Sequence, residues 1–181
     1  MKFLKVFLLK VIAGLRWKLE GWFFKRRAPK NWQDLDDIMN WREAIALDER
    51  SFDFLINGME YKSDPIKGLM DYSFPINKPE YFFKKLPFGR DCDDWARIWS
   101  AYYRFHHKVV EEWIVTTTKH PFKDSHFVAV VHEGDKFRLL DYSRWGLRDS
   151  AKEAVQSIGG HWEKYALDTL LAVRYHTWRP E

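Results

Sequence analysis

The only cysteine of the chain lies in a polar stretch, FGRDCDDWA, at residues 88–96. A cysteine among charged neighbours is a candidate nucleophile, because structural cysteines usually lie among apolar side chains. Asp91 predicts the start of a helix that runs to Tyr103, and Asp94, three residues later, completes a capping box. Cys92 would then lie in the first turn, where unpaired N–H groups and the positive end of the helix dipole favour a thiolate.

A thiolate here also needs a positive partner, because the two aspartates that follow the cysteine oppose its charge. Seven histidines are available, and a predicted β-hairpin of residues 127–132 and 136–142 selects His126. A type II′ turn at Gly134-Asp135 would pair position 133 with position 136. In that register His126 and Asp141 share one face and are diagonal neighbours at the open end of the hairpin. A shift of one residue would put them on opposite faces.

Cys92, His126 and Asp141 together predict a catalytic triad for acyl transfer. Asp141 would orient His126, and His126 would draw the proton from Cys92 to form a thiolate–imidazolium pair. The sequence contains no HExxH, CxxC or glycine-rich phosphate motif, which disfavours metalloenzymes and nucleotide-dependent enzymes. A single cysteine also excludes an internal disulfide. We therefore expect chemistry that uses no metal and no cofactor.

The stretch from Cys92 to Ala96 resembles the Cys-x-Asp-x-Ala element of transglutaminase-like proteins, a group that includes bacterial transglutaminase-like cysteine proteinases. His126 at the start of a strand and Asp141 at the end of the next are similar to the second and third elements of that family, in the same chain order. The resemblance covers about residues 80–145. It implies an α+β, papain-like fold in which the cysteine-bearing helix packs against an antiparallel sheet.

The same resemblance implies a thiol hydrolase, a cysteine peptidase or amidase, that cleaves a peptide or amide bond through an acyl-enzyme intermediate. Transfer of the acyl group to an amine, as in transglutaminases, is one alternative. A non-catalytic protein that keeps the fold and binds a membrane or a partner is the other.

Related enzymes often place a Gln, Asn or Tyr upstream of the cysteine to bind the oxyanion. Here residues 84–88 are KKLPF, so the nearest candidates for this role are Tyr81 and Asn77. The backbone N–H of Cys92 would be the first oxyanion donor, since donors must point to where negative charge develops.

The N-terminal segment 1–30 differs from the rest in charge. It holds nine Lys or Arg against one acid, Glu20, a balance of +8, whereas the remaining residues hold 21 basic and 25 acidic side chains, a balance of −4. The folded body is therefore not expected to bind nucleic acid. Apolar residues recur at helical spacing in this segment: Phe3, Phe7, Leu8, Val11, Leu15, Leu19 and Trp22.

This pattern predicts a basic amphipathic helix that lies on an anionic membrane surface or docks on a protein partner. Lys10 and Lys18 interrupt the apolar run, which makes a membrane span less suitable. An uncleaved signal-anchor and a helix packed on its own domain are the alternatives. We accordingly expect a cytoplasmic protein or one that associates peripherally with a membrane.

A chain of 181 residues is long enough for one domain with a substantial core. We expect three segments: the basic helix 1–30, a helical and loop-rich extension 31–80 that packs on the core, and a catalytic core 81–181. Residues 31–56 are predicted to be largely helical and 149–159 to form a short helix. Further strands are predicted at 113–119 and 170–178, so that helices followed by antiparallel strands give an α+β domain.

Overall fold

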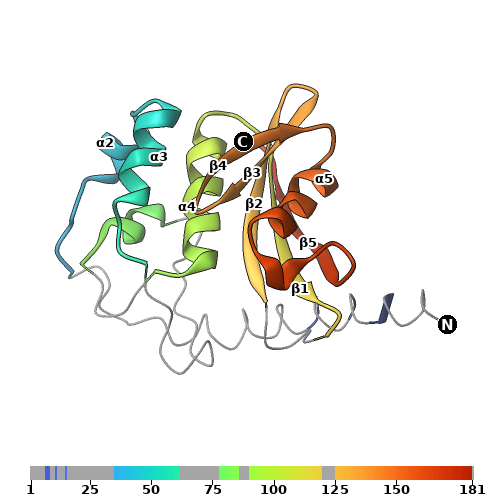
Figure 1. Cartoon of the computed structure of the whole chain (residues 1–181). Coiled ribbons are helices and arrows are strands. Elements are labelled where there is room, and N and C mark those ends of the chain that lie inside the picture. Colours follow the sequence, from blue (N-terminus) through green and yellow to red (C-terminus); the bar gives the residue numbers. More distant parts are fainter. Residues whose placement is uncertain are drawn as a thin grey trace.

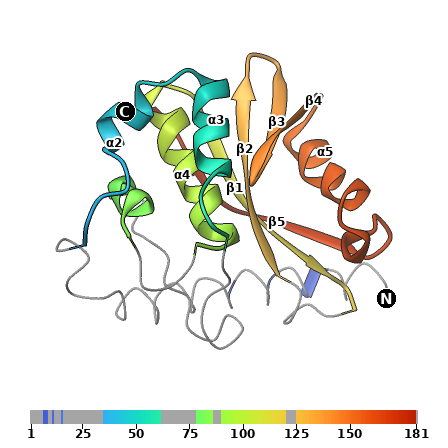
Figure 2. The same ribbon diagram turned by 60° about the vertical axis from the view of Figure 1, so that its left-hand side comes forward.

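The computed structural model describes Phe7, Leu8, Val11, Leu15 and residues 35–61, 78–85, 90–119 and 125–180. In these ranges the chain forms a five-stranded antiparallel sheet with helix α4 on one face and helix α5 on the other (Figures 1 and 2). The predicted α+β class is confirmed. Within the described ranges, no helix combines the length and the apolarity that crossing a membrane requires.

The strand order is β4-β3-β2-β1-β5, and each neighbouring pair is antiparallel. The strands are β1 Val110–Thr117, β2 His126–Glu133, β3 Lys136–Asp141, β4 Ser143–Arg148 and β5 Leu170–Trp178. The predictions for β2, β3 and β5 are confirmed. The prediction for β1 began three residues late because Glu111 and Glu112 are polar, yet both are buried in the strand.

The hairpin of β2 and β3 has the predicted register. Glu133 pairs with Lys136, and the ladder continues to the pair Ala129–Leu140. Gly134 has a φ of 66° and Asp135 does not lie in the left-handed region, as a type II′ turn requires. The face on which His126 and Asp141 lie is therefore the one that the sequence indicated.

Helix α4, Cys92–Phe105, begins as predicted. Asp91 is its N-cap, and Asp91 and Asp94 form a capping box. The side chain of each accepts a hydrogen bond from the backbone N–H of the other. Cys92 is the first residue of the helix. The predicted helix at 149–159 is α5, Ala151–Gln156, followed by the 3-10 turns η3, Ser157–Gly160, and η4, Glu163–Tyr165.

The segment 31–56 was predicted to be largely helical, and among its described residues the helical part begins only at Trp41 and is divided in two. The structure has two short helices, α2 Trp41–Ile45 and α3 Glu49–Asn57, and residues 35–40 are not helical. The physical reason lies in two capping residues. Asn40 accepts from the N–H of Arg42, and Asp48 accepts from the N–H groups of the first turn of α3, so each begins a new helix. A further 3-10 helix, η2, spans Pro79–Phe83.

Each face of the sheet carries its own core. The α4-side core includes the sheet residues Phe127, Ala129, Val131 and Leu140. The α5-side core includes the alternate sheet residues Val128, Val130 and Leu139. Helix α3 also contributes to the α4-side core through Phe52 and Ile56, so part of the 31–80 segment is packed in the interior.

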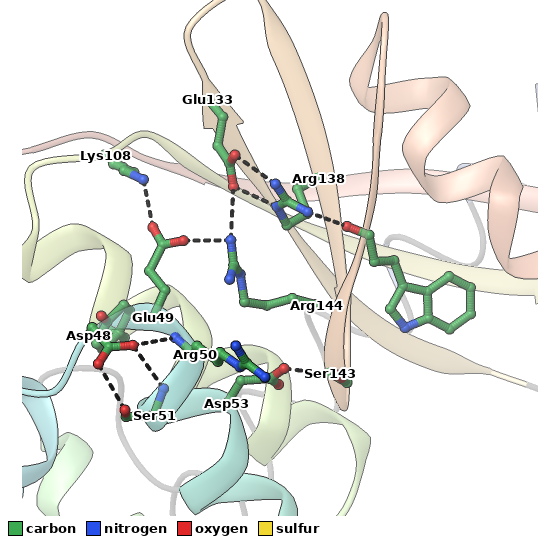
Figure 3. A network of polar contacts seen from close by, with 12 residues as sticks. Asp48, Glu49, Arg50, Ser51, Asp53, Lys108, Glu133, Arg138, Ser143 and Arg144 are labelled. Carbon is green, nitrogen blue, oxygen red and sulfur yellow. Dashed lines mark hydrogen bonds and ion pairs between the residues drawn. The ribbon is translucent and has the colours of Figure 1, made fainter.

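A network of ion pairs joins α3 to the sheet (Figure 3). Glu49 of α3 contacts Lys108 at 2.7 Å and Arg144 of β4 at 2.5 Å. Arg138 of β3 binds both carboxylate oxygens of Glu133 of β2, at 2.6 and 2.9 Å. Because these pairs are partly shielded from solvent and span four elements, they fix the position of α3 relative to the β3–β4 end of the sheet.

Candidate active site

His126 and Asp141 are in direct contact, as the sequence predicted. Nε2 of His126 lies 2.7 Å from Oδ1 of Asp141. His126 is the first residue of β2 and Asp141 the last of β3, and both are buried, with exposed fractions of 7% and 4%. A carboxylate held at this distance fixes the orientation of an imidazole ring, which is the arrangement that general base catalysis needs.

The His126 ring lies where β2 and β3 separate, beyond their last pair, Ala129–Leu140. The ring of Tyr142, which packs on the α4-side core, lies 5.5 Å from it. The ring of Tyr165, which belongs to the α5-side core, stacks on it at 6.0 Å. His126 is thus in contact with residues that belong to both cores of the sheet.

Cys92 is half-buried at the first position of α4 and packs on the α4-side core. Helix α4 and strand β2 are neighbours in the fold. They run in the same direction, so the Cys92 end of α4 and the His126 end of β2 lie at the same end of the molecule (Figures 1 and 2). The structure therefore joins His126 to Asp141 and places the Cys92 end of α4 at the same end of the fold.

Tyr142 interacts with both Cys92 and His126, and it was not among the predicted site residues. Burial raises the pKa of Tyr142 well above its usual range, and a negative charge on Cys92 raises it further once the thiol ionises. Its φ of 59° is unusual for an aromatic residue and is the kind of backbone strain that clusters at functional sites. Its position directly after Asp141 was the one signal available in the sequence.

Two indole groups also bind Asp141, and neither was predicted. Nε1 of Trp162 donates to Oδ2 of Asp141 at 3.0 Å. Nε1 of Trp145 donates to the backbone carbonyl oxygen of Asp141 at 3.2 Å. The carbonyl oxygen of Trp145 in turn accepts from Arg138 at 2.7 Å, which links the site to the ion-pair network of Figure 3. Spacing in the sequence could not reveal the contact of Trp162, because it depends on how the 157–165 turns fold back.

The two predicted oxyanion residues have different outcomes. Tyr81 is buried in η2, and its hydroxyl accepts a hydrogen bond from Lys78 at 3.3 Å. Asn77 lies outside the described residues. The role of either residue in binding an oxyanion stays a prediction.

One group of acidic side chains in the described ranges is close enough to share a cation: Asp91, Asp93 and Asp94, whose oxygens lie within 4.8 Å of one another. These carboxylates already have other functions. Asp91 and Asp94 form the capping box, and Asp93 pairs with Arg97 at 3.0 Å. The cluster is therefore explained by the start of α4.

Comparisons of the chain with models of known protein families, with curated proteins and with solved structures gave no match. The function is therefore inferred from the geometry of the site. The resemblance to transglutaminase-like proteins stays a prediction.

Proposed function

We propose that the protein is a thiol hydrolase that cleaves a peptide or amide bond through Cys92, His126 and Asp141, on a papain-like core. The observation that supports this most directly is the buried 2.7 Å contact between Nε2 of His126 and Oδ1 of Asp141. Because that contact occupies Nε2, Nδ1 is the ring nitrogen left to exchange a proton with Cys92.

The reaction proceeds in two stages, acylation and deacylation of Cys92. His126 takes the proton of the Cys92 thiol, and the thiolate attacks the carbonyl carbon of the substrate. The imidazolium then gives this proton to the departing amine as the C–N bond breaks, which leaves a thioester on Cys92. His126 next deprotonates a water molecule that attacks the thioester, and protonation of the sulfur releases the acid. The backbone N–H of Cys92, at the helix N-terminus, is the first donor to the oxyanion.

Transfer to an amine is the alternative fate of the same thioester. A primary amine in place of water would give a transglutaminase-type product from the same three residues. Both reactions need the same nucleophile, so the first experiment addresses the nucleophile itself.

The experiment is alkylation of Cys92 with iodoacetamide at pH 6. A thiolate held by His126 reacts at this pH, whereas a free thiol with a pKa of about 8.5 is almost fully protonated. We expect His126→Ala to slow alkylation by about tenfold or more, as the loss of a charge-paired partner should. His132→Ala is the matched control, because His132 lies on the same strand and also contacts a carboxylate, that of Glu111 at 3.1 Å. Equal and slow alkylation in the wild type and both variants would disprove the proposal.

A second candidate function is binding to an anionic membrane surface through the N-terminal segment. Its four described residues, Phe7, Leu8, Val11 and Leu15, are helical and have exposed fractions between 41% and 56%. At this spacing they share one helix face, and the segment carries nine Lys or Arg against one acid. Vesicles of anionic lipid should therefore co-sediment the wild type and release a Leu8→Asp/Leu15→Asp variant. Binding that is unchanged in the variant would count against this function.

A further inference from the structure

Both carboxylate oxygens of Asp141 have a partner. Oδ1 contacts Nε2 of His126 at 2.7 Å, and Oδ2 accepts a hydrogen bond from Nε1 of Trp162 at 3.0 Å. The Trp162 ring also lies edge-on to the His126 ring, with their centres 6.3 Å apart. One indole thus contacts both members of the pair.

The chain around Trp162 is built to hold the indole in this place. The N–H groups of His161 and Trp162 both donate to the carbonyl oxygen of Ile158, at 3.0 and 2.9 Å, and the N–H of Tyr165 donates to Trp162 at 2.8 Å. Ile158 and Tyr165 are fully buried and anchor the two ends of the turn in the α5-side core. The backbone carrying Trp162 is therefore fixed.

Gly159 shows how closely this turn is folded. A Cβ at Gly159 would lie 2.6 Å from the carbonyl oxygen of Tyr165, a distance that real Cβ atoms do not adopt. A larger residue here would push η3 away from η4 and so move Trp162, which lies between them in the chain.

The chemistry of an indole suits the task of orienting a carboxylate. Indole N–H is a donor only and carries no charge, so it fixes Asp141 without neutralising it. A hydrogen bond to an ionised acceptor is also stronger than one between neutral groups. With Oδ2 held, rotation of the carboxylate away from His126 would break both contacts.

We propose that Trp162 is a positioning residue of the site, whose indole N–H holds Asp141 so that Oδ1 stays directed at His126. This inference rests on the proposed thiol chemistry. Trp162 acts on Cys92 only through Asp141 and His126. The turn 157–165 is thereby the third element of the site, beside α4 and the β2–β3 hairpin.

The test is the pH dependence of iodoacetamide alkylation in the full chain with Trp162→Phe, which keeps an aromatic ring and removes the N–H. We expect alkylation at pH 6 to fall by about tenfold, the effect of losing one hydrogen bond to a charged group. At pH 9, where a thiol ionises without help, the rate should equal that of the wild type. A general loss of packing would not produce this difference between the two pH values.

Trp113→Phe is the matched control, because Nε1 of Trp113 donates to a carboxylate elsewhere in the sheet, Oε2 of Glu111 at 2.9 Å. Its alkylation should match the wild type at both pH values. A Trp162→Phe profile identical to that of Trp113→Phe would overturn the positioning role. If His126→Ala still slowed alkylation in that case, the proposed function would stand without it.

A measurement on the indole itself covers the case in which Trp162→Phe does not fold. In Asp141→Asn, the exchange of the Trp162 indole N–H with solvent, followed by proton NMR, should be faster than in the wild type, because a neutral amide is a weaker acceptor. Equal exchange rates in the two proteins would show that the hydrogen bond does not form, and would overturn the proposal.

Discussion

Glu112 places a carboxyl group in the interior between α4 and β1. It is 2% exposed, and its Oε1 lacks a hydrogen-bond partner among the described residues. Burial raises the pKa of Glu112, and the charge of Arg97 opposes this only in part. A buried carboxylate without full compensation is a source of instability.

The sign of the pH effect follows from this raised pKa. Below the ordinary value of 4.5 the group is neutral in both the folded and the unfolded chain. Between 4.5 and the raised folded value, the unfolded chain is ionised while the folded chain still holds the proton, so stability falls as the pH rises through this interval. We expect Glu112→Gln to be more stable than the wild type at pH 8, by about 1 kcal/mol or more, and equally stable at pH 4. Urea unfolding at the two pH values measures this, and Glu43→Gln, at an exposed position, should change neither.

At the scale of single residues, the sequence was informative where local rules decide the outcome. Asp91 and Asp94 predicted where α4 begins, and this placed Cys92 in its first turn. The contacts of Trp162 could not be foreseen, because they depend on a turn that returns to the sheet 21 residues after Asp141. No local pattern marks which of ten tryptophans makes such a return.

At the scale of elements, the β2–β3 hairpin carries the register on which the candidate site depends. Its turn residue Gly134 has a φ of 66°, and a Cβ there would meet open space. The demand for glycine at this position is therefore conformational and not steric.

This distinction gives a prediction. Gly134→Ala should lower stability by about 1–2 kcal/mol, the cost of a left-handed conformation for an L-residue. Gly160→Ala is the control, because a Cβ there also meets open space and its φ is not in the left-handed region. It should change stability by less than about 0.5 kcal/mol. Thermal unfolding of both variants measures the difference, and an equal loss in the two would contradict the conformational explanation.

Elements were predicted well where apolar residues follow a strict period, and poorly where polar residues lie inside an element. Strand β4 was not predicted because it is half-buried at best and carries Arg144 and Arg148. The break between α2 and α3 was not predicted, because the spacing of apolar residues does not show that Asp48 caps a new helix. In both cases a contact made by a polar side chain decides the local structure.

At the scale of the whole molecule, residues 41–57 share a core with the sheet. Phe52 of α3 is fully buried, stacks on Tyr102 at 4.1 Å and meets Trp99 edge-on at 5.3 Å. The ion pairs of Glu49 hold the first turn of the same helix (Figure 3). We expect this segment and the sheet to unfold in one transition, because neither is packed without the other.

Phe52→Ala tests this expectation. It should cost about 3–5 kcal/mol, as removal of a buried aromatic ring does, and far-UV circular dichroism and tryptophan fluorescence should report the same midpoint. Phe54→Ala on the same helix, at a residue with an exposed fraction of 84%, should be nearly neutral. Two separate transitions in the wild type would show instead that α3 belongs to an independent unit.

The edge strand β4 affects whether copies of the chain can associate through the sheet. The edge strand β4 carries Arg144 and Arg148, and its pairing with β3 shifts register between Arg138 and Leu140. Charge and uneven pairing both hinder another extended chain from adding to an edge. The protein should accordingly resist the growth of fibrils from β4, even in concentrated solution.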